Sequence, residues 1–286
     1  MKILLTGASG QVGHELERSL QGLGEVVTVD RGGMALDDLD QVRSVIRAVR
    51  PQLIVNPAAY TQVDKAESDS ALAYRVNAEA PGVMAEEAKR LGAALVHYST
   101  DYVFPGDQPG ARREDDATGP VNVYGASKLA GEQAIAASGV PHLIFRTSWV
   151  YGMRGKNFLL TMLRLAQERD ELRVVADQHG APTWSRTIAD TTALVLAQAR
   201  GHGAEWWQDN GGIYHLASRG ETTWHGFTQA ILAQAGRDCR VLPISSAEYP
   251  VPAKRPQFSM LDSGKLTARF CNLPSWQEAL RLCMTS

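Results

Sequence analysis

The sequence predicts an α/β fold, in which a doubly wound parallel sheet occupies the first half of the chain and a smaller cap occupies the second. Short apolar runs typical of buried strands alternate with longer helical segments over residues 1–150. The first run leads into a glycine-rich turn and then a helix, which is the start of a βαβ unit. Beyond residue 150 the alternation loosens. We therefore expect one domain over residues 1–150 and a second over 151–286, with some elements of the second returning to the sheet.

The N-terminal segment predicts a strand, a tight turn and a helix. Its apolar run (residues 3–5) is too short for a helix, and Gly7, Gly10 and Gly13 follow at three-residue spacing. Glycine permits positive φ and close approach of the backbone to a ligand, while the N–H groups that begin the helix attract a pyrophosphate. Asp30 closes the next apolar run, roughly 20 positions past the turn, where a carboxylate can hold an adenosine ribose. This pattern predicts a Rossmann-type dinucleotide-binding turn.

The elements after Asp30 continue the alternation. In chain order we expect a helix over residues 39–49, a strand over 53–55, a helical stretch over 69–91 with a break or kink at Pro81, a strand over 94–98, a helix over 123–138 and a strand over 142–145. A long loop covers residues 103–122, and loops of that length are often functional. Ligands of such sheets bind at the carboxyl ends of the strands, so the residues that follow the strands should share one rim.

The second half predicts fewer and shorter elements. We expect helices over residues 158–168, 187–199 and 224–235, strands over 172–175 and 213–216, and a last helix that starts near Ser275. Residues 243–256 are rich in proline and predict irregular backbone. Trp206 and Trp207 are unusual for a surface loop, which favours a packing role against the sheet.

Composition excludes several classes of protein. The chain is 44% hydrophobic and 21% charged with a net charge of −2, so nothing indicates binding to nucleic acid. No apolar run approaches the length of a membrane span, and a strand that begins at residue 2 leaves no room for a signal peptide. Its three cysteines are an odd number and widely spaced, as expected of reduced thiols. We expect a cytoplasmic protein that binds neither nucleic acid nor membrane.

Tyr124 and Lys128 are the most informative pair for chemistry. They lie four residues apart in the predicted helix 123–138, so both side chains occupy one helix face. A free phenol titrates near 10, and a nearby ammonium group favours its ionised form, which lets the pair exchange a proton near neutral pH. Thr100, at the end of a strand, can offer its hydroxyl to a substrate oxygen, and Asp101 can adjust the titration of the tyrosine. We expect these four residues to be catalytic.

Together these motifs resemble the extended short-chain dehydrogenase/reductase family over nearly the whole chain. The resemblance is carried by GASGQVG (7–13), AAYT (58–61), VDKAES (63–68), STDYVF (99–104), YGASK (124–128), RTSWVYG (146–152), NF (157–158), DQ (177–178), APT (181–183) and RP (255–256). It implies reduction by NADPH or NADH of the 4-keto group of dTDP-4-dehydro-L-rhamnose to dTDP-L-rhamnose, a precursor for lipopolysaccharide O-antigen. Hydride would pass from the nicotinamide to C4 while Tyr124 protonates the oxygen.

The motifs and the resemblance together give the candidate binding residues. For the cofactor these are Gly7, Gly10, Gln11, Val12, Gly13, Asp30, Arg31, Leu36, Ala58, Ala59, Tyr60, Thr61, Asn77, Tyr124 and Lys128. For the dTDP-sugar they are Thr100, Asp101, Trp149, Lys254 and Arg255. Asp30 favours the ribose hydroxyls of NADH, whereas Arg31 can bind the 2′-phosphate of NADPH, so we expect weak discrimination between the two. Because Ala35 stands where the family usually has aspartate, the adenine contact falls to Leu36 or Asp37.

The sequence does not predict a metal site. The seven histidines are scattered without zinc-like spacing, and His97 reads as an ordinary core histidine in a buried strand. Some members of the family hold Mg²⁺ through glutamates at a dimer interface, which makes a homodimer a candidate assembly. Glu15 matches one of these glutamates and is a weak candidate ligand, but Asp190 stands at the second position and the third has no clear counterpart.

Two alternatives stay open on the sequence. An epimerase of the same family shares the Tyr124 and Lys128 pair but retains its cofactor. The regulatory subunit of methionine adenosyltransferase resembles the same enzymes and binds NADP without catalysis. A dehydratase is disfavoured, because such enzymes usually carry Asp-Glu after the threonine, whereas Tyr102 follows Asp101 in this chain.

Overall fold

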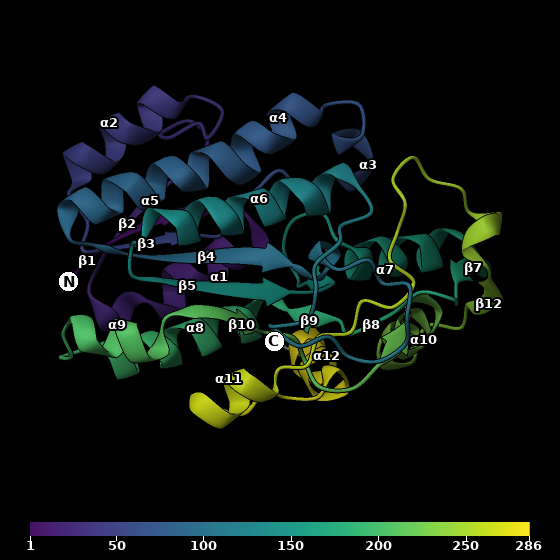
Figure 1. Cartoon of the computed structure of the whole chain (residues 1–286). Helices are drawn as coiled ribbons and strands as arrows, with labels where there is room; N and C mark the ends of the chain where they lie inside the picture. The colour runs from purple at the N-terminus through teal and green to yellow at the C-terminus, as the bar shows by residue number, and fades with distance from the viewer. Residues whose placement is uncertain (286) are drawn as a thin grey trace.

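A sheet of six strands, in the order β10-β5-β4-β3-β1-β2, forms the centre of the computed structural model, which describes residues 1–285. Each strand runs parallel to its neighbours. The strands are β1 (Lys2–Thr6), β2 (Glu25–Val29), β3 (Leu53–Asn56), β4 (Ala94–Thr100), β5 (His142–Thr147) and β10 (Gly212–His215). The strand order reverses at β1, so the crossovers place helices on both faces. The predicted fold class, a doubly wound parallel α/β sheet, is confirmed (Figure 1).

Each face of the sheet packs on its own layer of helices (Figure 1). One layer holds α2 (Leu39–Val49), α5 (Ala80–Leu91) and α6 (Val123–Ser138), and the other holds α1 (Gln11–Ser19) and α8 (Ser185–Ala199). Successive residues of a strand point to opposite faces. In β1, Leu4 packs with the layer of α2 and α5, whereas Ile3 and Leu5 pack with the layer of α1 and α8. Because both faces are buried, these strands are continuous apolar runs, which makes them predictable from sequence.

The long helical stretch around Pro81 divides into three parts. α4 (Ser70–Tyr74) continues through a π-helical turn over residues 75–79 into α5. The irregular turn precedes Pro81, because proline has no N–H for the carbonyl of Asn77 and its ring crowds that carbonyl. Gly131 of α6 packs so closely there that a Cβ would lie 2.1 Å from the Asn77 oxygen. The predicted break therefore exists, about one turn before the proline.

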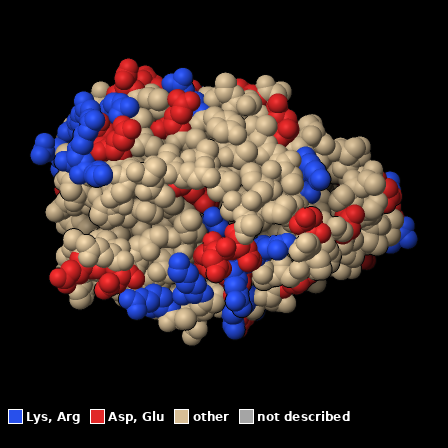
Figure 2. All heavy atoms as spheres, in the orientation of Figure 1, with Lys and Arg blue, Asp and Glu red and all other residues tan. Residues whose placement is uncertain are grey.

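Much of the second half of the chain forms a smaller body beyond the carboxyl ends of the strands, whereas β10 joins the sheet and α8 joins one of its helix layers (Figure 1). Its apolar cluster, which includes Leu159, Phe227 and Trp276, lies between α7 (Phe158–Glu168), α10 (Trp224–Gln234) and α12 (Trp276–Thr285). Three two-stranded pairings complete it: β7 (Glu171–Val175) with β12 (Arg240–Ile244), β8 (His179–Gly180) with β11 (Thr222–Thr223), and β6 (Val150–Tyr151) with β9 (Thr183–Trp184). No helix among residues 1–285 has both the length and the apolar character needed to cross a membrane. Acidic and basic side chains are interspersed over the face shown in Figure 2.

Several short elements were not predicted, among them α3 (Val63–Ala66), α9 (Ala204–Asn210), α11 (Gly264–Arg269) and β12. The expected irregular backbone is wrong for residues 243–244, which belong to β12. Pro243 is accepted there because β12 pairs with β7 alone, so its other edge needs no N–H donor. On α9, Trp206 and Trp207 pack against the core layer of α1 and α8, as expected from the sequence.

Candidate active site

A cavity of about 660 Å³ opens at the carboxyl ends of the strands. All of the predicted cofactor residues except Asn77 line it. They come from the turns that follow β1, β2 and β3 and from the first turns of α1 and α6. The cavity is also lined by residues that the sequence did not assign, among them Thr6, Ser99, Thr147 and Lys156. Motifs that are far apart in the sequence therefore meet at one site, as expected for strands of a parallel sheet.

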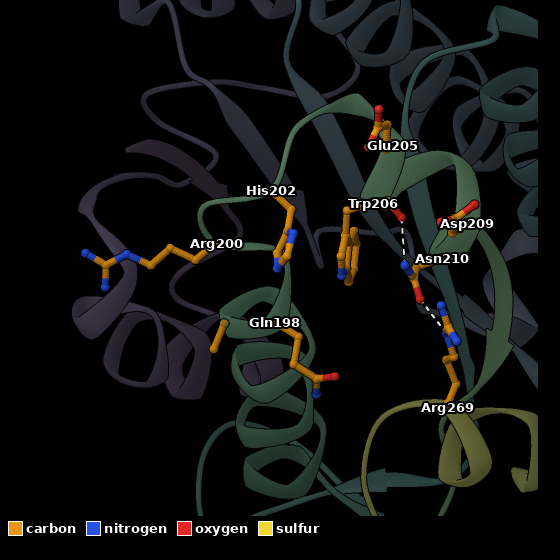
Figure 3. A pocket seen from close by; sticks show the side chains of 9 residues that line it. Gln198, Arg200, His202, Glu205, Trp206, Asp209, Asn210 and Arg269 are labelled. Carbon is orange, nitrogen blue, oxygen red and sulfur yellow. Dashed lines mark hydrogen bonds between the residues drawn. The ribbon is translucent and has the colours of Figure 1, made fainter.

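A second hollow, of about 700 Å³, lies between the end of α8 and α9, beside the amino end of β10 (Figure 3). Its polar groups already satisfy one another: Arg269 donates to the Asn210 side-chain oxygen, and Asn210 donates to the Trp206 carbonyl at 2.8 Å. Glu205 and Asp209 on its rim are exposed. We place the functional site at the carboxyl edge, because the glycine turn and the titratable groups with shifted pKa values converge there.

The glycine-rich turn is built for close approach of a ligand. Gly7 has φ of +58°, a conformation that side chains with a Cβ rarely adopt. A Cβ on Gly13 would lie 2.1 Å from the Gly7 carbonyl oxygen, so only glycine lets α1 pack against the turn. Gly10 caps α1 without a side chain, which leaves the N–H groups of the first helical turn directed at the cavity. Asn157 holds the turn in place by donating to Gln11 Oε1 at 2.9 Å.

The turn after β2 places one acidic and one basic side chain at the cavity. Asp30 Oδ1 accepts from the N–H groups of Gly32 at 2.9 Å and Gly33 at 3.2 Å, which fixes the carboxylate at the rim. Arg31 is 83% exposed and lies 3.5 Å from Asp37 Oδ2, a contact too exposed to hold the guanidinium firmly. The Arg31 side chain is therefore available to a ligand at this end of the cavity.

Asn77 lies behind the cavity wall instead of lining it. Its side chain is 1% exposed. The amide oxygen accepts from Tyr60 N at 2.8 Å, and the amide nitrogen donates to Tyr60 O and to Ser127 Oγ, each at 3.0 Å. These three bonds use the hydrogen-bonding groups that a cofactor would need. Asn77 therefore positions the loop of Ala59 to Thr61 against α6, and the prediction of direct contact with the cofactor needs this correction.

Tyr124 lies in the first turn of α6, which Asn122 caps by accepting from Gly125 N at 2.8 Å. Burial raises the pKa of Tyr124 to about 12, while a hydrogen bond with Thr100 opposes the rise and Asp101 adds to it. The expected lowering of this pKa by Lys128 is wrong for the protein alone, because desolvation of the phenol outweighs any such effect. A phenol that stays protonated at neutral pH is the form that can donate a proton.

Lys128 is one turn further along α6 and only 2% exposed. Its Nζ lies 3.1 Å from His97 Nε2, at the floor of the cavity. Burial lowers the pKa of Lys128 to about 8, against the opposing charge of Glu132. Glu132 is itself paired with Arg146 of β5, with an Oε2 to Nη2 distance of 2.7 Å. The ammonium group is therefore held in a largely desolvated position in the wall of the cavity that Tyr124 also lines.

Thr100 is the last residue of β4, and Asp101 begins the 3₁₀ turn that follows it. Both are buried, and the Thr100 hydroxyl donates to Asp101 Oδ1 at 2.9 Å. Burial raises the pKa of Asp101 to about 7, although the hydroxyls of Ser259 and Thr100 oppose the rise. A carboxyl group with this pKa changes its protonation state near neutral pH. Neither side chain lines the cavity of about 660 Å³.

Trp149 is held by three contacts from the second half of the chain. Its ring stacks on Trp224 with centroids 3.5 Å apart, and its Nε1 donates to Ser259 Oγ at 3.2 Å. A Cβ on Gly180 would lie 2.5 Å from the indole, so the ring also packs directly on that backbone. The φ of Trp149 is +46°, an unusual conformation for a bulky residue and one often found at functional sites. No local sequence signal marked Trp224 or Ser259 as its partners.

Lys254 and Arg255 differ sharply in their surroundings. Lys254 is exposed, and its backbone carbonyl accepts from Asn122 Nδ2 at 2.8 Å. The Arg255 side chain is 18% exposed, and its Nη2 donates to Asp64 Oδ2 at 2.8 Å. The other terminal nitrogen of Arg255 is buried and has no hydrogen-bond partner among residues 1–285. Only Arg255 therefore carries an unsatisfied charged donor, which an anionic group can use.

Comparisons to known proteins identify the family of the chain. A family model described as the RmlD substrate binding domain matches residues 1–286. A dTDP-4-dehydrorhamnose reductase of Burkholderia thailandensis is 51% identical over 296 aligned residues, which cover 99% of this chain and 98% of the relative. The chain belongs to the dTDP-4-dehydrorhamnose reductase family.

Solved structures of this family share the whole architecture. The dTDP-4-dehydrorhamnose reductase of Clostridium acetobutylicum superposes with a TM-score of 0.92 at 36% identity, covering 100% of this chain and 99% of that one. The enzyme of Bacillus anthracis, solved in complex with NADP, superposes with a TM-score of 0.90 at 36% identity, covering 99% and 98%. Both halves of the chain therefore belong to the family fold.

Neither carboxylate considered for magnesium gathers a set of ligands around it. Glu15 lies on α1. Asp190, on α8, accepts from Ser19 Oγ at 2.6 Å and pairs with Arg186. Within residues 1–285, no group of three or more His, Cys, Asp or Glu side chains is placed to hold a metal ion. One copy of the chain thus offers no preformed ion site in the part that the structure describes.

Proposed function

We propose that the protein reduces the 4-keto group of dTDP-4-dehydro-L-rhamnose to dTDP-L-rhamnose with NADPH or NADH, the last step of dTDP-rhamnose synthesis, in the cytoplasm. The observation that carries the proposal is the convergence of Tyr124 and Lys128 with the glycine turn on one cavity. Membership of the reductase family supports the choice of reaction and of the dTDP-sugar. The relative from Bacillus anthracis that was solved with NADP supports the choice of cofactor.

The cavity fits a nicotinamide dinucleotide. The N–H groups after Gly10 suit the pyrophosphate, Asp30 suits the adenosine ribose, and Arg31 suits a 2′-phosphate. Lys128 is placed to donate to the nicotinamide ribose from the cavity floor. When bound, the reduced cofactor supplies the hydride.

Tyr124 supplies the proton in this proposal. Its raised pKa keeps the phenol protonated at neutral pH, so a proton is ready for the oxygen that was the keto group. Thr100 donates a second hydrogen bond to that oxygen, and Asp101 accepts from Thr100 before the substrate binds. Charge that develops on the oxygen is thereby stabilised by two hydroxyl donors in a buried setting.

The cap holds the sugar nucleotide. Arg255 offers its unsatisfied nitrogen to the diphosphate, and Lys254 adds positive charge from the surface. Trp149, fixed by its stack on Trp224, presents an aromatic surface to the apolar side of the deoxysugar.

A panel of 4-keto sugar nucleotides tests the proposal. The purified protein is offered substrates that differ in the nucleotide and at C6, with NADPH oxidation as the measurement. We expect turnover of the 6-deoxy-4-keto sugar on dTDP, and loss of bound nucleotide on dialysis. Tightly retained nucleotide together with interconversion of sugar epimers would indicate an epimerase instead. A protein that binds NADPH but turns over no sugar, and that co-purifies with one stoichiometric enzyme, would indicate the non-catalytic regulatory subunit.

A further inference from the structure

A buried chain of polar side chains runs beneath the cavity. Thr6 Oγ1 lies 2.6 Å from Asn56 Oδ1, Asn56 Nδ2 lies 3.1 Å from His97 Nδ1, and His97 Nε2 lies 3.1 Å from Lys128 Nζ. The four residues are at most 2% exposed. Thr6 and Asn56 are the last residues of β1 and β3, His97 lies in the middle of β4, and Lys128 lies on α6. Thr6 and Lys128 are the first and last side chains of this hydrogen-bonded series, and both line the cavity.

We infer that His97 is a positioning residue, which accepts a hydrogen bond from the Lys128 ammonium group and so fixes that group at the cavity that Tyr124 also lines. The hydrogen bond between His97 and Lys128 does not depend on the proposed function. Only its expected effect on turnover rests on that function. Nζ has no other hydrogen-bond partner among residues 1–285. The remaining two N–H bonds of Lys128 are thereby left for groups in the cavity. Without the histidine, a long flexible side chain would be buried with its charge unsatisfied.

The geometry requires one particular form of the histidine ring. An ammonium group can only donate, so Nε2 must carry a lone pair and the ring proton must be on Nδ1. The pKa of His97 lies well below its usual value because the ring is fully buried and Lys128 is close by, so the ring stays neutral. Nδ1–H then needs an acceptor, which Asn56 provides when its amide oxygen turns to the ring. The Thr6 hydroxyl accommodates this, because it can donate or accept.

The other tautomer of His97, with its proton on Nε2, would form a weaker hydrogen bond with Lys128. If Asn56 kept its amide nitrogen toward Nδ1, the proton would sit on Nε2 and face the lysine, which would have to be a neutral amine. A hydrogen bond from a charged donor is roughly twice as strong as a neutral one, so the ammonium form determines the tautomer. Among charged groups, Glu132 acts on Lys128 from the next turn of α6, and Arg146 of β5 pairs with Glu132. Asp101 acts on Tyr124, so it influences the phenol end of the site instead.

Two amide substitutions separate a positioning role from simple core packing. In His97→Gln the side-chain amide reaches the place of Nε2 and keeps an acceptor for Lys128. In His97→Asn the amide reaches only the place of Nδ1, so the bond to Asn56 is kept and the one to Lys128 is lost. We expect His97→Gln to retain kcat within a few-fold and His97→Asn to lose about 10²-fold, the cost typical of a misplaced catalytic group. The alkaline limb of the pH–kcat profile should also move to lower pH in His97→Asn, because the ammonium form loses its acceptor.

The ring itself can be observed without any assay of turnover. Nitrogen NMR of the wild-type protein, with His97 labelled, should show a neutral ring protonated on Nδ1 at pH 6 to 7, where Lys128 is charged, and Lys128→Met should change the Nε2 signal. Protonation on Nε2, or equal kcat and equal pH profiles for the Gln and Asn variants, would overturn the inference. If wild type turns over none of the sugars, the proposed function fails, whereas the NMR result still decides the contact between His97 and Lys128. Thermal unfolding and NADPH titration of each variant identify a loss of fold.

Discussion

The two walls of the site are built on different principles. The cofactor wall consists of the turns at the ends of β1, β2 and β3 and the start of α6, and its key contacts involve backbone groups of those same turns, such as Asp30 with Gly32. The cap wall, which includes Trp149 and Arg255, depends on side-chain pairs that are far apart in the sequence. Trp149 bonds with Ser259, 110 residues away, and Arg255 bonds with Asp64, 191 residues away. Residues of the cofactor wall could therefore be recognised from local motifs, whereas the contacts of the cap wall depend on how the second half of the chain packs.

If catalysis depends on residues of the cofactor wall, substitution of Tyr124 should lower turnover more than any other change. Tyr124→Phe keeps the ring and removes the proton donor, so kcat should fall by about 10²–10⁴-fold with little change in NADPH affinity. NADPH oxidation with the keto-sugar nucleotide measures the first quantity, and fluorescence titration measures the second. The matched control is Tyr102→Phe, whose ring lies 5.9 Å from that of Tyr124 and does not line the cofactor cavity. Similar losses in both variants would sink the assignment of Tyr124.

Asp101 lies where the two walls meet. Its substitution should give the next largest effect, a change in the free energy of unfolding. Its folded pKa of about 7 lies above the ordinary value of 3.8, so the fold prefers the neutral carboxyl. Its contribution to stability is therefore full below about pH 4, is lost as the pH rises to about 7, and stays lost above that. Asp101→Asn, which cannot ionise, should gain stability over wild type between pH 5 and 8, by about 4 kcal/mol at most.

Urea unfolding of Asp101→Asn and wild type at several pH values checks this dependence. The difference between the two proteins cancels the other titrating groups, so it should follow Asp101 alone. A difference that does not change with pH would show that the Asp101 carboxyl is not desolvated in the folded protein.

Substitutions in the cap wall should change the affinity for substrate and leave turnover nearly unchanged. Arg255→Ala should raise KM for the sugar nucleotide by about 10-fold or more while kcat changes little, because a charged hydrogen bond contributes about 1.5–3 kcal/mol equally to ground and transition states. Lys254→Ala is the matched control, since that side chain is exposed and should shift KM far less. Steady-state kinetics of both variants tests the pair, and a larger effect at Lys254 would reverse the assignment.

The smallest effect should come from the exposed edge of the cofactor wall. Arg31→Ala should lower kcat/KM for NADPH by a few-fold and leave NADH nearly unchanged, because an exposed and screened cation contributes little. The ratio of kcat/KM for the two cofactors, in wild type and variant, measures the effect. An unchanged NADPH value would show that Arg31 does not meet the 2′-phosphate.

Elements with a local cause could be predicted from the amino-acid sequence alone. The bounds of α2, α6 and α7 agree with the predicted 39–49, 123–138 and 158–168. Each helix has a capping residue directly before it, Asp38, Asn122 or Asn157, and α2 and α7 also show an amphipathic period. The glycine turn and the four-residue spacing of Tyr124 and Lys128 were readable for the same reason. Short elements such as α3 and α9 were not, since a helix of one or two turns has too few residues to show a period.

Which side chains are buried together depends on the folding of distant segments, and no sequence pattern indicated it. The sequence assigned Asn77 to the cofactor and His97 to the core, whereas the fold makes Asn77 a support for the Tyr60 loop and sets His97 against Lys128. It also reversed the expected direction of the Tyr124 pKa, because desolvation depends on atoms from strands and loops that are distant in the chain. Hydrogen-bond partners and dielectric surroundings are properties of position in space, and a one-dimensional pattern records residue types and their spacing only.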